Sequence, residues 1–522
     1  MRKILLATTM LAVAAELPAQ SQTRPQTAQA QTQAQAPDVQ KTVEAVQYAL
    51  GMIRGVQRID AVNNVVLVGT GTMGAVGQAW RPDMPWPLFK LTSYKASIKH
   101  SDWGLRVEIE RTNPDGVVQG GGGLPLAAPQ KLVQVVAGKF AWNETQPGIN
   151  PTPAQGTYSD RLLQFWTLTP LAAIKAARMG GTETKLITEG GVKILTFPAP
   201  GLAGVTLRAT LNGKNLIDRV ETRVDNPVLG DTLVETTYSD YRDLDPERQT
   251  DVPVPHHIVQ KQGGYPVLDL TITGGRMGYA YIVFPIPENV EKAAAQPPAP
   301  VRVDSQKVAD GVWYLTGGTH HSVLVEFKDY VTVVEGPLTE ERAMAVIDAV
   351  KKLASNKPIR YVVNTHHHFD HSGGLRAFVA EGATVLTQTL NKPYYEKVWM
   401  NPHTMTPDRL GKVRRKPVVE AVADKRVLGD GTRSLVLYRL QSSNHADTML
   451  IGYLPKERIL IEADVYTPPA ANAPPPTTVN AEAANLYANI ERLKLDVAPI
   501  LPLHGRQVTI ADLRAAIGRS TN

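Results

Sequence analysis

The sequence predicts an α/β protein with a β-rich N-terminal domain and a C-terminal domain in which strands and helices alternate. Between residues 60 and 286, short runs of strand type are separated by turns rich in Gly, Pro and Asn. A Pro/Ala-rich stretch, PIPENVEKAAAQPPAP, occupies residues 285–300, and strands alternate with an amphipathic helix after it. A chain of 522 residues has room for two or three such domains.

The first residues are typical of an export signal. Arg2 and Lys3 form a basic start, and residues 4–15 form an apolar run that small residues follow. We therefore expect residues 1–19 to be a signal peptide and the protein to be periplasmic or secreted. Residues 20–40, which are rich in Gln and Ala, are expected to be a disordered tether. No later stretch reaches the ~18 apolar residues of a membrane span, so no integral membrane segment is expected after signal removal.

Residues 41–286 are expected to form the β-rich domain, whose role the sequence does not indicate. The spacing of Val43, Val46 and Leu50 predicts a short helix over residues 40–51. One longer helical segment is predicted at residues 159–179. Strand patterns recur at residues 64–69, 94–98, 105–111, 193–197, 205–211 and 268–273. This pattern favours a large curved antiparallel sheet with few helices, and it is similar to the half-barrel sheets of periplasmic lipoprotein-carrier domains.

Residues 287–301 are interpreted as a Pro/Ala linker, and residues 302–522 as an α/β sandwich domain. Strands are predicted at residues 312–316, 322–327, 331–335 and 360–364, and a helix at residues 340–353. The last of these strands is apolar and leads directly into the sequence THHHFDHSGG.

The histidines indicate a metal site in this second domain. Nine of the twelve follow residue 319. In a loop, His366 and His368 can converge on one ion while Asp370 and His371 turn to a second. Imidazole and carboxylate are the ligands that zinc prefers when thiolate is absent, and this chain has no cysteine. The predicted cofactor is therefore a pair of Zn²⁺ ions, with other divalent metals such as Fe or Mn as alternatives.

The spacing His366-x-His368-x-Asp370-His371 resembles the signature of the metallo-β-lactamase superfamily, and the resemblance covers residues ~303 to 520. It implies an αββα sandwich and three later ligands. This chain offers a histidine in SNHAD, an aspartate at the end of RILIEAD and a histidine in ILPLHG. The resemblance implies a first metal on His366, His368 and His445, a second metal on Asp370, His371 and His504, a bridging Asp464, and a catalytic role for Asp370.

One position departs from the family pattern. The second strand of the domain usually ends in Asp-x-Gly, whereas this chain has Glu335 followed by Gly336. We expect Glu335 still to accept hydrogen bonds from groups around the ligands. His367 is expected to point away from the metals, and His320 and His321 lie in a loop from which either could contact a substrate.

Residues 391–433 carry ten Lys or Arg against five Asp or Glu, a surplus of +5. Together with aromatic residues such as Tyr394 and Trp399, this surplus predicts a lid or wall beside the metals that suits an anionic substrate, with Arg414 and Arg415 as the cations. The alternative is a solvated surface.

The leading hypothesis for function is an exported dinuclear zinc hydrolase that uses a metal-bridging hydroxide to attack a carbonyl ester, lactone or amide, β-lactams included. A phosphodiesterase or alkylsulfatase acting on an anionic substrate is the alternative. A third hypothesis, of another class, is a lipid- or polysaccharide-binding protein with a vestigial hydrolase site. The partner is expected to be a small molecule, and no motif indicates nucleic acid. The sequence names neither the substrate nor the oligomeric state.

Overall fold

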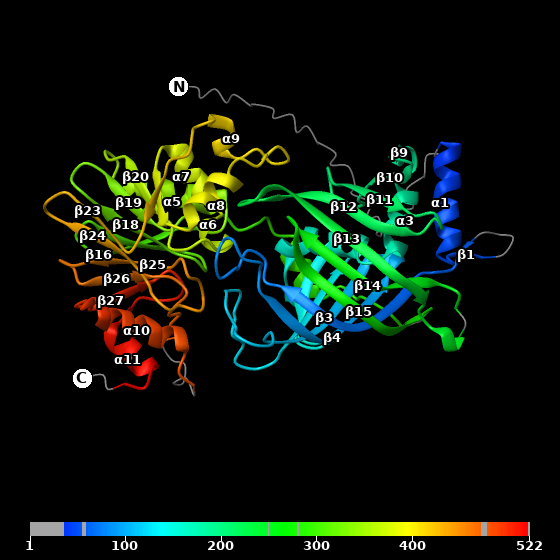
Figure 1. Cartoon of the computed structure of the whole chain (residues 1–522), viewed down its shortest axis with the longest axis horizontal. Coiled ribbons are helices and arrows are strands. Elements are labelled where there is room, and N and C mark those ends of the chain that lie inside the picture. The colour runs from blue at the N-terminus through cyan, green and yellow to red at the C-terminus, as the bar shows by residue number, and fades with distance from the viewer. Residues whose placement is uncertain (1–35, 55–58, 249, 279–280, 471–477, 520–522) are drawn as a thin grey trace, which may run out of the picture.

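The computed structural model describes residues 36–54, 59–248, 250–278, 281–470 and 478–519. The predicted signal peptide at 1–19, and residues 20–35 of the predicted tether, lie outside the described residues. The chain forms two lobes that lie side by side, with the N-terminal sheet in one and the C-terminal sandwich in the other (Figure 1). No helix among the described residues is both long and apolar enough to cross a membrane.

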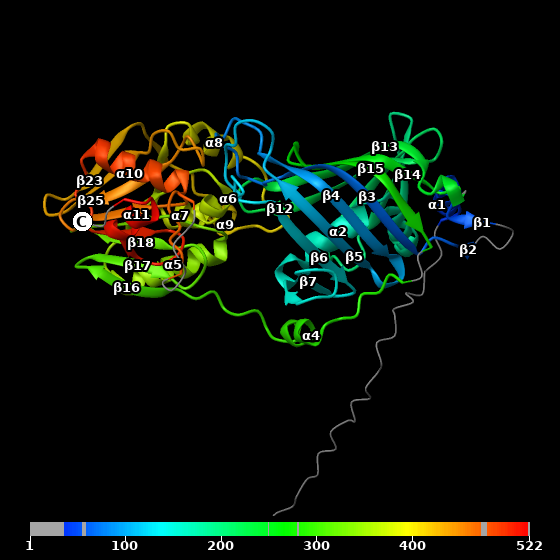
Figure 2. The ribbon, with the colours of Figure 1, turned by 90° about the horizontal axis from the view of Figure 1, so that it is seen from below.

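The N-terminal domain is built on one antiparallel sheet of thirteen strands, which confirms the predicted large sheet. Its spatial order is β8-β7-β6-β5-β4-β3-β15-β14-β13-β12-β11-β10-β9. The strands are β3 (Asn64–Gly74), β4 (Leu88–Lys99), β5 (Gly104–Thr112), β6 (Gln130–Ala137), β7 (Phe140–Glu144), β8 (Thr152–Pro153), β9 (Lys185–Glu189), β10 (Val192–Pro198), β11 (Thr206–Leu211), β12 (Ile217–Asn226), β13 (Gly230–Asp243), β14 (Pro253–Gln262) and β15 (Tyr265–Met277). The sheet curves around helices that fill its inner face (Figure 2).

Those helices differ from the prediction at two points. The single helix expected at 159–179 is two helices, α2 (Tyr158–Thr167) and α3 (Pro170–Met179). Pro170 cannot donate a backbone hydrogen bond and disfavours a helical residue before it, so Thr169 is extended and caps α3 through its side chain. Helix α1 (Pro37–Ala49) begins within the predicted tether, because a proline fits the first turn of a helix.

The predicted linker contains a further helix, α4 (Glu288–Ala294), which packs against the N-terminal domain. Val290 is buried beside residues of β6 and β7, and Asn289 donates from Nδ2 to the carbonyl oxygen of Pro151 over 2.7 Å. Figure 2 shows α4 within the connecting segment that passes from one lobe to the other.

The C-terminal domain has four layers, which confirms the predicted αββα sandwich. A sheet of β16 to β22 in sequence order faces a sheet of β23 to β28, and a buried apolar cluster joins them. Helices α5 and α7 pack on the first sheet, and α10 and α11 pack on the second. The first sheet comprises β16 (Asp304–Ala309), β17 (Val312–Thr316), β18 (Ser322–Glu326), β19 (Val331–Val334), β20 (Ile359–Val363), β21 (Thr384–Gln388) and β22 (Val419–Val422).

The second sheet comprises β23 (Lys425–Gly429), β24 (Ser434–Arg439), β25 (Leu450–Leu454), β26 (Ile459–Glu462), β27 (Pro499–Pro502) and β28 (Val508–Thr509). The helices of this domain are α5 (Glu340–Leu353), α6 (Phe369–Ser372), α7 (Leu375–Glu381), α8 (Asn391–Val398), α9 (Arg409–Val413), α10 (Ala481–Leu493) and α11 (Ile510–Ala516). Strands β19 to β22 run parallel to one another, as do β26 and β27, so each set ends at one edge of its sheet.

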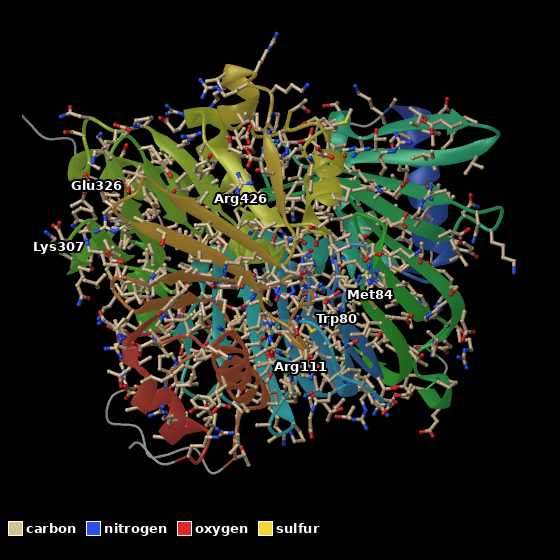
Figure 3. All side chains as sticks on the ribbon, turned by 60° about the vertical axis from the view of Figure 1, so that its left-hand side comes forward. Trp80, Met84, Arg111, Lys307, Glu326 and Arg426 are labelled. Atoms are coloured by element: carbon tan, nitrogen blue, oxygen red, sulfur yellow. The ribbon has the colours of Figure 1, made fainter. Side chains whose placement is uncertain are left out.

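The two lobes meet through loops of the N-terminal sheet. The β3–β4 loop, residues 75–87, and the β5–β6 loop, residues 113–129, extend toward the C-terminal domain (Figure 1). In Figure 3, Trp80 and Met84 of the β3–β4 loop lie near the middle of the view, whereas Lys307 and Glu326 lie at the outer edge of the sandwich. Trp80 donates from Nε1 to the carbonyl oxygen of Ser443 over 2.9 Å.

Candidate metal centre

The seven predicted ligands meet at one edge of the sandwich, because each lies in a loop that follows or precedes a strand at that edge. The loop after β20 carries His366 to His371, and Asp464 and His504 follow β26 and β27. His445 precedes β25. The buried Asn364 at the end of β20 holds this loop, since its amide donates to the carbonyl oxygen of His371 and its Oδ1 accepts from the Tyr395 hydroxyl at 2.8 Å.

The first group of candidate ligands is His366, His368, His445 and Asp464. His366 Nε2 lies 3.0 Å from His368 Nδ1 and 3.3 Å from His445 Nε2. Asp464 Oδ2 lies 2.9 Å from His445 Nε2. Burial, reinforced by the neighbouring imidazoles, holds the pKa of His366 and of His368 well below 6.5. Both rings are therefore neutral at pH 7, the state in which imidazole binds metals.

The second group is His320, Asp370, His371 and His504. His504 Nε2 lies 3.0 Å from His371 Nε2, and Asp464 Oδ1 lies 2.8 and 3.0 Å from these two nitrogens. Asp464 therefore places one carboxylate oxygen against each group. Its backbone φ is +63°, in the left-handed region, which is uncommon for a residue other than glycine and is found at functional sites.

For three of the candidate ligands, hydrogen bonds to one ring nitrogen determine which nitrogen is left to bind a metal ion. His368 Nε2 donates to the carbonyl of Ala79, His371 Nδ1 to the Glu335 carboxylate, and His504 Nδ1 to the carbonyl of Thr319. In the neutral form of each ring, the opposite nitrogen then carries a lone pair that faces its group. Lone pairs and carboxylate oxygens at 2.8–3.3 Å from one another repel unless a proton or a metal ion lies between them. The imidazole and carboxylate donors of each group thus fit a metal ion.

Glu335 accepts hydrogen bonds around the ligands, as predicted. Its carboxylate is fully buried; Oε2 lies 3.0 Å from His371 Nδ1 and also accepts from the Thr365 hydroxyl. Burial lowers the pKa of His371, but the carboxylates of Asp464 and Glu335 outweigh it and raise that pKa well above 6.5. Binding of an ion at His371 Nε2 must therefore displace a proton.

The N-terminal domain completes the surroundings of both groups, which sequence reasoning missed. Gln78 donates from Nε2 to Asp370 Oδ1 over 2.9 Å, and the carbonyl of Ala79 holds His368. On the β5–β6 loop, a Cβ on Gly121 would lie 2.1 Å from Gln78 Oε1 and 2.7 Å from Cε1 of His368. Glycine is needed there because the loop backbone passes so close. The glycine run at 120–123 was the available signal, but nothing in the sequence linked it to the histidines.

Of the two histidines in the loop before β18, only His320 joins a group. Its Nε2 lies 3.2 Å from Asp370 Oδ2, and its ring meets that of His504 edge-on at 4.0 Å between centroids. This nitrogen can hold an ion or hydrogen-bond to Asp370. His321 Nε2 instead contacts the carbonyl of Gly505 at 2.9 Å.

The remaining predicted residues lie outside both groups. His367 turns away from the metals, as expected, and its Nδ1 contacts the Thr448 hydroxyl at 3.0 Å. Among the residues that the structure describes, none from the basic segment 391–433 belongs to either group of candidate ligands. It forms α8, α9, β22 and β23 instead, and it reaches the N-terminal domain where the amide of Thr404 donates to Asp231.

Residues 315–501 match the family model of the metallo-beta-lactamase superfamily. The C-terminal domain is a metallo-beta-lactamase superfamily domain. Its αββα layers and its ligand-bearing edge agree with that assignment, and the N-terminal sheet lies outside the matched residues.

Other comparisons concern parts of the chain. A stretch of 76 residues, 14% of this chain, is 34% identical to a linear primary-alkylsulfatase from Pseudomonas sp and covers 11% of that protein. The chain thus spans about a tenth of the length of this curated relative. A metallo-beta-lactamase from Pontibacter korlensis is 18% identical, with 42% of this chain and 98% of that chain covered and a TM-score of 0.31. The rubredoxin oxygen:oxidoreductase from Desulfovibrio gigas is 16% identical, with 41% of this chain and 61% of that chain covered and a TM-score of 0.31.

Proposed function

We propose that the protein is a dinuclear zinc hydrolase. The observation that carries this proposal is the position of Asp464, whose Oδ2 faces His445 at 2.9 Å while its Oδ1 faces His504 at 2.8 Å. One carboxylate thus joins two groups of imidazoles. Two divalent ions bound there would supply a nucleophilic water at neutral pH and polarise the oxygen of the scissile bond.

The chain's own residues would orient a substrate at the exposed side of this centre. The side chain of Asp370 is 32% exposed and that of His504 is 19% exposed, whereas those of His366 and His371 are fully buried. Asp370 is held from both sides, by Gln78 at Oδ1 and by His320 at Oδ2. An accessible, fixed carboxylate is suited to orient a nucleophile and to pass a proton to a leaving group.

For the substrate, the first candidate is a carbonyl ester, lactone or amide. A neutral carbonyl needs no fixed cationic side chain at the reacting bond. The described side chains that contact Asp370 and His504 are the amide of Gln78, the imidazoles of His320 and His371 and the carboxylate of Asp464. A second candidate, hydrolysis of an alkyl sulfate, is favoured by the local 34% identity to a linear primary-alkylsulfatase.

The test is a substrate panel on the purified full-length protein, loaded with zinc. It contains p-nitrophenyl acetate, a γ-lactone and nitrocefin for the first candidate, and dodecyl sulfate for the second. We expect turnover of at least one carbonyl substrate that stops after chelation and returns with zinc. Turnover of dodecyl sulfate alone would select the second candidate. A zinc-loaded protein that hydrolyses none of these substrates would contradict both.

We also propose that the protein is exported. The basic start and the apolar run at residues 4–15 support this, although those residues lie outside the described ones. N-terminal sequencing of the native protein should find a start between residues 15 and 22. An intact Met1 on the mature protein would contradict export by a cleaved signal.

A further inference from the structure

A cavity of about 730 Å³ lies between the two domains, behind the ligand loop. Its walls come from the β3–β4 loop, from the turns β12–β13 and β14–β15 of the N-terminal sheet, and from α8 of the C-terminal domain. Its size falls in the range of small-molecule binding sites. None of the seven candidate ligands lines it.

The ligand loop divides its side chains between the metal centre and this cavity. The loop is extended up to His368, where helix α6 begins, and successive side chains of an extended segment point to opposite sides. His366, His368 and Asp370 belong to the metal groups, whereas His367 and Phe369 line the cavity. The two sites are therefore on opposite sides of one short segment.

His367 offers the cavity a buried polar atom. The residue is 3% exposed, and its Nε2 has no hydrogen-bond partner among the described residues. The carbonyl oxygen of Ala79, which accepts from His368 Nε2, also lies near the His367 ring, but it makes no well-aligned hydrogen bond with His367 Nε2. A buried polar atom without a partner is costly in a folded protein, and a ligand atom would satisfy it.

Aromatic rings form the apolar part of the wall. Trp86 stacks on Tyr265 with 4.7 Å between ring centroids and meets Phe369 edge-on at 5.7 Å. Trp86 and Tyr265 come from the N-terminal sheet domain, and Phe369 comes from the ligand loop. Such a wall buries an aliphatic or aromatic group.

Two cations lie at the exposed part of the wall. Arg223 and Lys397 are both exposed, and neither has a carboxylate partner among the described residues. Of the acidic side chains in the same wall, Asp231 accepts from the amides of Thr404 and Met405, and Asp83 pairs with Arg81. Arg223 donates from Nη1 to the backbone carbonyl oxygen of Asp231 over 2.9 Å. Its other guanidinium nitrogens, and the ammonium of Lys397, can therefore pair with an anion at the mouth.

We propose that this cavity is a second binding site, for an amphipathic anion: an alkyl or aryl chain with a carboxylate or sulfate head group. The chain lies against Trp86 and Phe369, the head group pairs with Arg223 and Lys397, and His367 hydrogen-bonds a polar atom of the ligand. Because His367 and Phe369 share a loop with His366, His368 and Asp370, an occupant of the cavity also contacts the segment that holds the metals.

The test is calorimetric titration of the zinc-loaded full-length protein with octanoate and, as the uncharged probe, octan-1-ol. We expect Arg223→Gln combined with Lys397→Gln to weaken octanoate about tenfold, the loss of a charge-assisted contact, and to leave octanol unchanged. Trp86→Leu should weaken both probes. The control, Arg242→Gln with Lys214→Gln, removes two cations of the same domain away from the cavity and should bind both probes as the unmodified protein does.

Two results would overturn the proposal. One is an unchanged octanoate affinity in the Arg223 and Lys397 variant whose melting temperature is also unchanged. The other is loss of octanoate binding in Asp464→Asn while Trp86→Leu binds normally, because the probe would then sit at the metal centre. Both readouts are binding, so they do not depend on which substrate the enzyme hydrolyses.

Discussion

The Nε2 atom of His368 lies 2.9 Å from the carbonyl oxygen of Ala79, a residue 289 positions earlier in the chain. The hydrogen bond fixes the ring so that Nδ1 faces the first group of ligands. A metal ligand of the C-terminal domain is therefore oriented by the N-terminal domain. Groups of this kind set the orientation of the ring, and their loss typically lowers metal affinity about 10- to 100-fold.

Gln78 allows the contribution of the N-terminal domain to be measured. Gln78→Leu removes the donor to Asp370 Oδ1 and keeps a side chain of similar size. We expect the affinity for the second metal to fall about 10- to 100-fold while the first metal stays bound. Zinc titration against a chromogenic chelator measures both steps. Gln260→Leu, which removes a hydrogen bond to Thr236 elsewhere in the sheet, should leave both steps unchanged; equal effects in the two variants would contradict a specific role for Gln78.

Asp370→Asn tests the chemistry separately from the fold. The change keeps the volume of the side chain and removes its charge and basicity. None of His366, His368, His445 and Asp464 changes, so the first metal should stay bound. The affinity for the second metal should fall, and kcat should fall by roughly 10²–10⁴, the range for loss of a positioned acid–base group. Near-native kcat with two metals bound would rule out the proposed role of Asp370.

His320 should contribute to the second metal, whereas its neighbour should not. His320→Ala removes one imidazole of the second group. The affinity for the second metal should therefore fall about tenfold or more, as it does when an orienting or ligating imidazole is lost. His321→Ala is the matched control, since His321 contacts the Gly505 carbonyl instead. Metal titration and melting temperature of both variants are the measurements. If His321→Ala weakens the second metal as much, the effect is one of folding.

Local patterns predicted the sandwich and the first four candidate ligands, at residues 366–371, whereas His445, Asp464 and His504 were implied by the resemblance to the metallo-β-lactamase superfamily. Apolar strands end shortly before His366, Asp464 and His504, and imidazoles at positions i and i+2 of a loop can converge on one ion. The break between α2 and α3 was also readable in principle, since Pro170 is a local signal. One continuous helix was predicted instead, because the helical spacing of apolar residues continues across the proline.

Contacts between the domains could not be predicted in the same way. Gln78, Ala79 and Gly121 lie more than 240 positions before the ligand loop, and no local periodicity relates them to it. The basic segment 391–433 shows the same limit. Its composition predicted a charged wall, but Lys397 lines the interdomain cavity, and Arg414 and Arg415 do not. Which cation of a charged segment faces a cavity depends on how the segment folds.

The buried His100 should make the N-terminal domain acid-sensitive. Burial, with the nearby Lys175, lowers the pKa of His100 from 6.5 to about 3. Between these two pH values the unfolded chain binds a proton that the folded chain does not, so stability falls as the pH falls through 6.5. The loss from pH 7 to pH 5 is about 2 kcal/mol for a shift of this size. In urea unfolding, His100→Gln should lose about 2 kcal/mol less than the unmodified protein over that interval; equal losses would contradict the assignment.

The number of zinc ions per chain tests the central claim most directly. Full-length protein should be stripped with a chelator, titrated with zinc at pH 7, freed of excess metal and measured by elemental analysis. Because Asp464 faces both groups of imidazoles, we predict two tightly bound ions per chain in the unmodified protein and at most one in Asp464→Ala. One ion or none in the unmodified protein at saturation would contradict a dinuclear centre.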